Sequence, residues 1–381
     1  MAIVIIGTGL AGYTTARELR KHDTTTPLTL VTADSGRAYS KPMLSNGYRK
    51  EQAPGDLVQA EPDAMAETLD ARVISGERVA GVAPDEGRVT LASGEVLSAE
   101  QVVLATGADP IEPPLAGDGG DRVFQINDLD QYEQFRNAAA GSRSVVIVGG
   151  GLIGCEFAND LAAAGYAVTM VFPEDRPLPR LLPERPAAGL RTGLEGLGVD
   201  MRSGRAVAQV DHQGSGVVAT LDDGAQIEAD LVLAAVGLRP RTGLAADAGL
   251  TVNRGICVDR YLATCHPQVF ALGDCAEVEG YVLPYVAPLT NAARALGASL
   301  AGEPTPVHYP VMPVSVKTSC CQVVAWPPEP DAAGEWHCDG EAPDLRCDYR
   351  TPDGTLAGFA LTGKRIKERM ALTKAMPPLL E

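Results

Sequence analysis

The sequence has no long apolar run and no excess of basic charge. Nowhere in its 381 residues does a stretch approach the roughly eighteen consecutive apolar residues of a membrane-spanning helix. The N-terminal residues show no basic region ahead of the first apolar run, so no secretion signal is predicted. Asp and Glu outnumber Lys and Arg by 49 to 32, a net charge of −17 that repels nucleic acid and anionic membranes. We expect a soluble, cytoplasmic protein that binds neither DNA nor a membrane.

Cysteine and histidine are too scattered for a metal site. The eight cysteines include no CxxC pair, and they do not combine with the five histidines at zinc-finger spacing. Cysteine usage of this kind is typical of a reducing compartment. We therefore expect no bound metal.

Aromatic residues make up only 5% of the chain, whereas glycine occurs 41 times. Glycine suits tight turns between strand and helix and a close approach of the backbone to a ligand. The length is enough for two or three domains, and the balance of apolar and charged residues is that of a globular protein.

Two segments repeat one pattern of strand, glycine turn, helix and strand. The first has an apolar run at 3–6, a helical segment at 11–21 and a second strand at 28–31. The second has strands at 145–148 and 167–172 on either side of its helix. This order predicts parallel strands with crossover helices. The fold class is therefore predicted to be α/β, with two doubly wound, Rossmann-like dinucleotide-binding domains.

Other segments complete this organisation. Apolar strands that end in glycine, at 102–107 and 231–237, close the two units, and the proline- and glycine-rich stretch 108–120 is typical of a crossing between domains. After residue 303 the chain changes to proline-rich strands and ends in a basic helical pattern at 364–374. We predict a third, small α+β domain there.

The two glycine turns carry the motif of a dinucleotide-binding loop. Their sequences are Gly7-Thr8-Gly9-Leu10-Ala11-Gly12 and Gly149-Gly150-Gly151-Leu152-Ile153-Gly154. In such a loop the first glycine permits the tight turn, the second admits a pyrophosphate and the third lets helix and strand pack closely. Two loops predict two dinucleotides, and FAD with a nicotinamide nucleotide is the pair between which hydride passes directly.

Acidic residues follow the second strand of each unit, where the adenosine ribose of a dinucleotide binds. Asp34 is the acid of the first unit and Glu174 that of the second. Arg176 is near enough to Glu174 to meet a 2′-phosphate instead. NADH is therefore the expected cofactor beside FAD, and NADPH stays open.

Six motifs follow one another along the chain: GTGLAG, SKPMLS, LATG, GGGLIG, AVGLRP and ALGDCAE. In this order they resemble the FAD-dependent pyridine nucleotide oxidoreductases of the glutathione-reductase type, and among these the rubredoxin and flavorubredoxin reductases. The resemblance implies a discontinuous FAD-binding domain at 1–112 and 244–303. It also implies an inserted NAD(P)-binding domain at 113–243 and a C-terminal interface domain at 304–381.

The resemblance further implies roles for single residues. Asp34 would bind the FAD ribose, Val79 would lie by the adenine, Asp274 would bond the ribityl chain and the Val286 backbone would pass near the flavin pyrimidine edge. On the residues alone, Asp274 could instead cap a helix and Val79 could belong to the core. The matched motifs place further residues in the cofactor sites: Gly7, Gly9, Leu10, Ala11, Gly12, Ala33, Pro42, Ala105, Thr106, Gly107, Gly149, Gly151, Leu152, Ile153, Gly154, Glu174 and Gly237.

Three charged residues are candidates for the chemistry. Lys41 precedes Pro42, which favours an extended backbone that presents the amine. By resemblance Lys41 lies beside flavin N5, where a cation stabilises the negative charge that arrives with hydride. Glu156, in the first helical turn after the second glycine loop, would pair with Lys41 and contact the carboxamide. Lys317 would reach the flavin from the third domain. The alternatives are a solvated loop lysine for Lys41 and an acid that favours the helix dipole for Glu156.

The stretch 41–48 contains no cysteine. Relatives that reduce disulfides need a redox cysteine pair, and those that reduce peroxide carry one cysteine in this region. Electrons must then leave the flavin directly, one at a time. By resemblance the expected partner is rubredoxin, with a ferredoxin or a flavorubredoxin as alternatives, and a redox sensor that binds FAD and NADH is the alternative of another class. No role is predicted for the vicinal pair Cys320 and Cys321.

The basic residues are unevenly distributed. Residues 1–50 hold seven basic against three acidic residues, and Lys364–Lys374 holds five basic residues against Glu368 alone. We expect these two segments to form one basic patch near the flavin edge, at which an acidic electron carrier docks. A solvated basic helix at 364–374 is the alternative.

Overall fold

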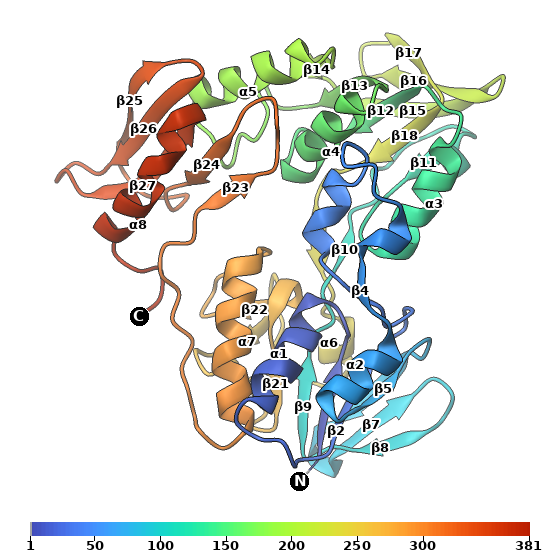
Figure 1. The fold of residues 1–381 in the computed structure, drawn as a ribbon, viewed down its shortest axis with the longest axis vertical. Coiled ribbons are helices and arrows are strands. Elements are labelled where there is room, and N and C mark those ends of the chain that lie inside the picture. Colours follow the sequence, from blue (N-terminus) through green and yellow to red (C-terminus); the bar gives the residue numbers. More distant parts are fainter. Residues whose placement is uncertain (1) are drawn as a thin grey trace.

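The structure, a computed structural model that describes residues 2–381, has three lobes (Figure 1). The first lobe contains the N-terminal elements and lies at the bottom of Figure 1, the second lies at the upper right, and the third holds the C-terminal strands at the left. The chain passes from the first lobe to the second, returns to the first and then enters the third.

The first lobe is built on a parallel sheet with the strand order β21-β9-β1-β2-β5. Its strands are β1 (Ile3–Ile6), β2 (Leu28–Val31), β5 (Arg72–Ile74), β9 (Gln101–Leu104) and β21 (Val269–Ala271). All four residues of β1 are buried, as expected for a central strand that is covered on both faces. Because β21 comes after the second lobe in the chain, two separate segments build the first lobe.

Two helices of the first lobe pack closely against each other. A Cβ on Gly297 of α7 (Val286–Leu300) would lie 2.7 Å from the backbone of Glu18 in α1 (Leu10–Arg20), so only glycine allows this approach. The remaining elements of the lobe are β3 (Ala38–Tyr39), β4 (Val58–Ala60), α2 (Pro62–Leu69), β6 (Val79–Ala83), β7 (Arg88–Leu91), β8 (Val96–Ser98), α6 (Gly243–Asp247), β20 (Ile256–Val258) and β22 (Ala276–Val278). A 3-10 segment, η1 (Lys41–Asn46), follows β3.

The second lobe repeats this architecture, with the parallel strand order β11-β18-β12-β13-β14. The strands are β11 (Val123–Phe124), β12 (Ser144–Val148), β13 (Ala167–Phe172), β14 (Asp200–Ser203) and β18 (Leu231–Ala234). The helices are α3 (Leu129–Ala139), α4 (Leu152–Ala163) and α5 (Glu184–Gly196), and an antiparallel sheet adds β15 (Val207–Gln213), β16 (Gly216–Leu221) and β17 (Gln226–Ala229). The predicted α/β class with two Rossmann-like units is confirmed.

The first two lobes are joined by a pair of antiparallel strands. These are β10 (Ala108–Pro110) and β19 (Leu238–Pro240), through which the chain leaves the first lobe and returns to it. Arg241 fixes the junction, because its Nε donates to Asp109 Oδ1 at 2.6 Å and its backbone N–H donates to Gly107 O at 2.9 Å. The domain boundaries at residues 112, 243 and 303 stay a prediction.

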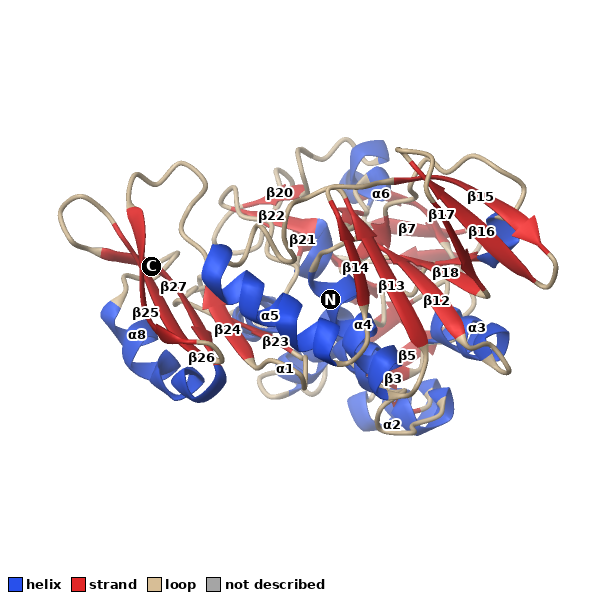
Figure 2. Cartoon of the chain, turned by 90° about the horizontal axis from the view of Figure 1, so that it is seen from above, coloured by secondary structure: helices blue, strands red, loops and turns tan. Residues whose placement is uncertain are grey.

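The third lobe is an antiparallel sheet with the order β23-β24-β27-β26-β25, covered by one short helix (Figure 2). Its elements are β23 (Val314–Val316), β24 (Val323–Trp326), β25 (Glu335–Glu341), β26 (Asp344–Arg350), β27 (Leu356–Thr362) and α8 (Arg369–Ala375). The predicted basic helix is shorter than expected, since a 3-10 segment, η6 (Gly363–Glu368), precedes α8.

None of the helices described in residues 2–381 is both long and apolar enough to span a bilayer.

Candidate functional site

The glycines of the first loop, between β1 and α1, have different surroundings. A Cβ on Gly7 (φ +115°) would lie 2.2 Å from Ala105 O, and one on Gly12 would lie 1.9 Å from Gly7 O. Protein packing therefore excludes a side chain at both positions. At Gly9, the residue that precedes α1, a Cβ would meet no atom within 4 Å. Only the middle glycine borders open space.

The second loop, between β12 and α4, has the same arrangement. A Cβ on Gly149 (φ +123°) would lie 2.4 Å from Ala235 O and one on Gly154 2.2 Å from Gly149 O, whereas Gly151 has no atom within 4 Å. Backbone N–H groups in the first turn of a helix lack partners inside that helix. Each loop therefore offers donors and open space, which fits the pyrophosphate of one dinucleotide in each lobe.

Asp34 lies beside the first glycine loop, three residues beyond the end of β2. Its Oδ1 accepts hydrogen bonds from Thr32 Oγ1 at 2.7 Å, from Gly36 N at 2.9 Å and from Thr8 Oγ1 at 3.3 Å. These bonds fix the exposed carboxylate next to Thr8, a member of the loop. Val79, at the start of β6, is half-buried against the core of the first lobe, and Ala33 is exposed.

The ends of β9 and β21 bring two predicted segments together. Leu104 and Ala271 are register partners, so Ala105-Thr106-Gly107 and Asp274 follow strands that end side by side. Only 20% of the Asp274 side chain is exposed, and this burial raises the pKa of its carboxyl while Lys41 opposes the shift.

Lys41 begins η1 and reaches across to the second lobe. Its Nζ donates to Asn127 Oδ1 at 2.6 Å and lies 4.0 Å from Asp274 Oδ2. Burial lowers the pKa of the Lys41 amine below its ordinary value, and Asp274 partly opposes this. The lysine is thus close to one residue of each lobe. Pro42 follows it at the second position of η1.

Glu156, buried in α4, pairs with a different lysine from the one predicted. Its Oε1 accepts from the Lys317 backbone N–H at 3.0 Å, and its Oε2 accepts from Ser45 Oγ at 2.7 Å and from Lys317 Nζ. The predicted pair of Lys41 with Glu156 is therefore wrong. The physical reason is that Lys317, just after β23, already donates to the Glu156 carboxylate, while the Lys41 amine donates to Asn127.

Two further polar residues of α4 connect the second lobe to the others. Asp160 Oδ2 and Oδ1 accept from the backbone N–H groups of Tyr48 and Arg49 at 2.9 and 3.0 Å. Asn159 Oδ1 accepts from Ser319 N at 2.9 Å and from Cys320 N at 3.1 Å. Sequence reasoning missed both residues, because neither has a motif and their partners lie more than a hundred residues away.

Burial disfavours the thiolate at Cys155, Cys275, Cys320 and Cys321, because it raises the pKa of each thiol, to about 11 for Cys320 and Cys321. The exposed Cys265 differs, since hydrogen bonds with Thr251 lower the pKa of its thiol. Cys338 and Cys347, register partners on β25 and β26, form a disulfide that the sequence did not predict. Within residues 2–381 no cluster of three or more His, Cys, Asp or Glu residues that could hold a metal ion occurs.

The adenosine side of the second loop is open. Glu174 is exposed beyond the end of β13, and Arg176 is paired with Asp175 at 3.1 Å. Next to Arg176 a cavity of about 370 Å³ separates the loop 176–184 from the third-lobe aromatics Trp336 and Tyr349. The positions of Glu174 and Arg176 do not decide between NADH and NADPH, so NADH stays the prediction and NADPH the alternative. Leu152 and Ile153 are half-buried in the first turn of α4, and Gly237 (φ +128°) follows β18.

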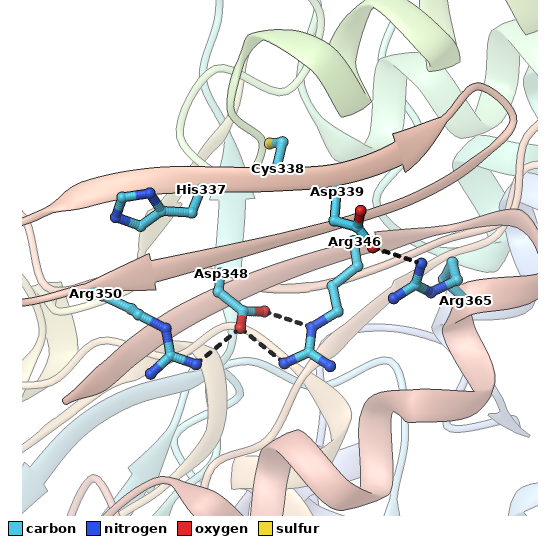
Figure 3. Close-up of a pocket in the computed structure, with 7 residues that line it drawn as sticks. All are labelled: His337, Cys338, Asp339, Arg346, Asp348, Arg350 and Arg365. Carbon is cyan, nitrogen blue, oxygen red and sulfur yellow. Dashed lines mark hydrogen bonds and ion pairs between the residues drawn. The ribbon is translucent and has the colours of Figure 1, made fainter. Parts of the chain in front are cut away.

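A second cavity, of about 320 Å³, lies on the third lobe and is rich in arginine (Figure 3). Arg346 and Arg350 both point to Asp348, at 2.7 and 3.1 Å, and Arg365 points to Asp339 at 3.2 Å. Glu368 also pairs with Arg346 and Arg365, so three acids balance the three arginines and this cavity is not a free anion site.

The predicted single basic patch stays a prediction, although one basic residue of the segment 1–50 is directed away from the C-terminal segment. Arg20 donates to Leu69 O at 2.6 Å and to Asp70 O at 2.9 Å, which directs it to α2. Figure 1 places α2 and α8 on opposite sides of the molecule. The basic residues that remain exposed near α8 are Lys364, Lys367, Arg369 and Lys374.

Val286 and Lys317 complete the predicted set. Val286 is the first residue of α7 and is 45% exposed, so its backbone is accessible at a helix start. Lys317 directly follows β23 and contacts Glu156 and Ser45. Ser45 and Asn127 were not predicted, although Ser45 lies inside the SKPMLS motif.

Similarity to known proteins extends over the whole chain. Residues 1–297 match the family Pyridine nucleotide-disulphide oxidoreductase, and residues 306–376 match the Rubredoxin binding C-terminal domain. The chain is 48% identical over 379 residues to a Rubredoxin-NAD(+) reductase of Alcanivorax borkumensis, covering 99% of both chains. It is 36% identical over 375 residues to a Nitric oxide reductase FlRd-NAD(+) reductase of Vibrio vulnificus, covering 98% of this chain and 97% of the relative.

The fold is shared with a chain of a solved reductase complex. The crystal structure of a covalent putidaredoxin reductase–putidaredoxin complex aligns with a TM-score of 0.90 at 26% identity, covering 99% of this chain and 94% of the other. The two open glycine loops, the paired parallel sheets and the match over residues 1–297 agree with one another. The chain belongs to the pyridine nucleotide-disulphide oxidoreductase family, with a C-terminal rubredoxin-binding domain.

Proposed function

We propose that this protein is an FAD-dependent NADH oxidoreductase that passes electrons from NADH through flavin to rubredoxin. One observation carries the proposal: each of two parallel sheets ends in a glycine loop whose middle glycine borders open space, in a chain whose third lobe matches a rubredoxin-binding domain. Bound FAD would accept hydride from the nicotinamide and release its electrons singly. FAD belongs to the first lobe in this proposal, and NADH to the second.

The first lobe's residues bind and orient FAD. Gly9 and the first turn of α1 would hold the pyrophosphate, and Asp34, fixed by Thr32, would hold the adenosine ribose. Val79 would lie against the adenine, Asp274 and the loop after β9 would contact the ribityl chain, and the start of α7 would meet the pyrimidine edge. We propose the domain boundaries that the sequence predicts, with FAD bound by residues 1–112 and 244–303 and NADH by residues 113–243.

The second lobe's residues hold the nicotinamide nucleotide. Gly151 and the first turn of α4 would bind its pyrophosphate, and Glu174 its adenosine ribose. Lys41 keeps a positive charge beside Asp274, where it would stabilise negative charge on the flavin. The Glu156–Lys317 pair joins α4 to the third lobe, with the carboxylate buried and the lysine partly exposed.

Rubredoxin is the proposed electron acceptor, docking with the third lobe at 304–381. The similarity to a rubredoxin reductase along 99% of the chain supports this over a ferredoxin, and the relative from Vibrio vulnificus keeps a flavorubredoxin as the second candidate. A cytoplasmic location is part of the proposal, because NADH is generated there. Counting free thiols in protein isolated from cytoplasm under thiol-blocking conditions would test whether the Cys338–Cys347 disulfide forms in that compartment.

The substitution Gly9→Val tests the flavin site. A side chain there would occupy the open space of the first loop, so the purified variant should be colourless while wild type is yellow with one FAD. Gly55, also with nothing within 4 Å of a Cβ but in a surface turn, provides the control Gly55→Val. A colourless wild-type protein would contradict the proposal.

A second experiment tests the NADH side. Glu156→Ala should slow the reduction of flavin by NADH in stopped flow and leave reoxidation by rubredoxin nearly unchanged. The reason is that α4, whose first turn would hold the nicotinamide nucleotide, loses the contact with Lys317 that fixes its position. Equal losses in both half-reactions would assign Glu156 a structural role only. Rapid NADH binding without any electron transfer to a carrier would favour a redox sensor instead.

A further inference from the structure

Asn127, between β11 and α3, holds the side chain of Lys41 from the second lobe. Its Oδ1 accepts from Lys41 Nζ at 2.6 Å, whereas the Asp274 carboxylate is 4.0 Å away from the same amine. The nearest partner of the ammonium group is therefore a neutral amide and not a carboxylate.

The orientation of this amide is fixed. Asn127 is 6% exposed, its Nδ2 donates to Ala108 O at 2.9 Å, and its backbone N–H donates to Gln131 Oε1 at 2.8 Å. Because a carbonyl oxygen accepts the amide NH₂, the oxygen is the atom that remains for Lys41. A rotated amide would set its NH₂ against the ammonium group and its oxygen against Ala108 O.

The two anchors of Asn127 belong to the junction of the lobes. Ala108 begins β10, one of the two crossing strands, and Gln131 lies in the first turn of α3. The neighbouring Asp128 caps this helix by accepting from the Gln131 backbone N–H at 2.7 Å. The position of Asn127 is thus set by the Ala108 backbone on one side and by the Gln131 side chain on the other.

We propose that Asn127 is a positioning residue that fixes the Lys41 ammonium group beside Asp274 without neutralising its charge. This inference rests on the proposed function, in which the Lys41 cation stabilises negative charge on the flavin. A carboxylate at contact distance would cancel most of the field that the cation provides, whereas an amide oxygen binds it and leaves the net charge in place. The charged groups that face Lys41 are Asp274, Arg241, Asp128 and Asp109.

A double-mutant cycle in the FAD-loaded protein tests the proposal, with Lys41→Met, Asn127→Leu and the double variant. Lys41→Met should slow flavin reduction by NADH about 100-fold and Asn127→Leu about 10-fold. Both should lower the midpoint potential of the flavin, and Asn127→Leu should add nothing when Lys41 is already Met. Asn137→Leu, at an exposed position of α3, is the control and should leave rate and potential unchanged.

Each result has a distinct meaning. An Asn127→Leu effect of equal size with and without Lys41 would overturn the positioning role, as would an unchanged potential in Asn127→Leu. A wild-type potential in Lys41→Met would contradict the proposed role of Lys41 and this inference together. If Asn127→Leu fails to fold, Asn127→Asp replaces it and should lower the potential, because it brings a carboxylate to the amine. Faster acylation of the Lys41 amine in Asn127→Leu, measured by peptide mass spectrometry, supports the loss of positioning without involving flavin.

Discussion

Lys41, which begins η1, and Lys317, which contacts Ser45 of the same segment, are held in opposite ways. Lys41 donates to a neutral amide oxygen at 2.6 Å, and its closest carboxylate is 4.0 Å distant. Lys317 donates both its backbone N–H and its Nζ to the Glu156 carboxylate, which is 2% exposed.

This difference separates two uses of one side-chain type. A lysine in contact with a buried carboxylate forms a neutral pair, which can join segments but exerts little field on a third group. A lysine held by an amide keeps its charge available. We therefore assign Lys317 to the assembly of the lobes and propose Lys41 for the chemistry.

The largest effect is expected on the rate of flavin reduction when Lys41 is replaced. Lys41→Met should slow flavin reduction by NADH about 100-fold, because a preorganised cation is lost at the site where charge develops. Lys317→Met should slow it much less. Stopped-flow measurements of flavin reduction in both FAD-loaded variants test this difference. Equal losses of rate would contradict the distinction between the two lysines.

The second effect concerns stability and is expected at Glu156. Glu156→Gln should lower the free energy of unfolding by about 2 kcal/mol, since the Lys317 ammonium group loses its partner, although 31% exposure lets water compensate in part. Adding Lys317→Met should restore part of the loss. Glu18→Gln, which removes a more exposed helical pair with Lys21, is the control and should cost well under 1 kcal/mol. A Glu156→Gln protein as stable as wild type would contradict the account of Lys317.

The parts of the molecule that the sequence predicted are those with local signals. The glycine loops, the parallel strands and the third domain follow from short motifs and periodicity, and they are confirmed. The partners of the lysines did not follow, because Lys41 meets Asn127 across 86 positions and Lys317 meets Glu156 across 161. Contacts at such separations depend on how the lobes dock, which no local pattern encodes.

The third prediction uses pH. Burial lowers the pKa of the Lys41 amine below its ordinary value of 10.5. The cation is lost as the pH rises through this lowered pKa, so the rate of flavin reduction should fall at alkaline pH before an ordinary lysine would titrate. Lys41→Arg should abolish this fall, because a guanidinium stays charged. A profile between about pH 7 and pH 10 that is the same in both proteins would show that another group is titrating.

The smallest effect is expected at the surface of the third lobe. Lys364, Lys367, Arg369 and Lys374 are exposed beside the exposed Met370, and we expect them to steer an acidic carrier. The rate with rubredoxin should fall a few-fold between low and physiological salt, as the Debye length shrinks to about 8 Å. Lys367→Glu should remove part of this dependence, whereas Arg72→Glu on the first lobe should not. A rate that rises with salt, with NADH reduction unaffected, would exclude the steering role.

The most direct test of the whole account is anaerobic mixing of the yellow protein with NADH and oxidised rubredoxin, while the visible absorbance of rubredoxin is followed. The account predicts that rubredoxin is reduced rapidly and only when protein and NADH are both present. Two rubredoxin molecules should be consumed per NADH, since NADH carries two electrons and the iron centre accepts one. Rubredoxin that stays oxidised while the flavin is reduced, or NADH oxidation that does not depend on rubredoxin, would contradict the proposed electron path.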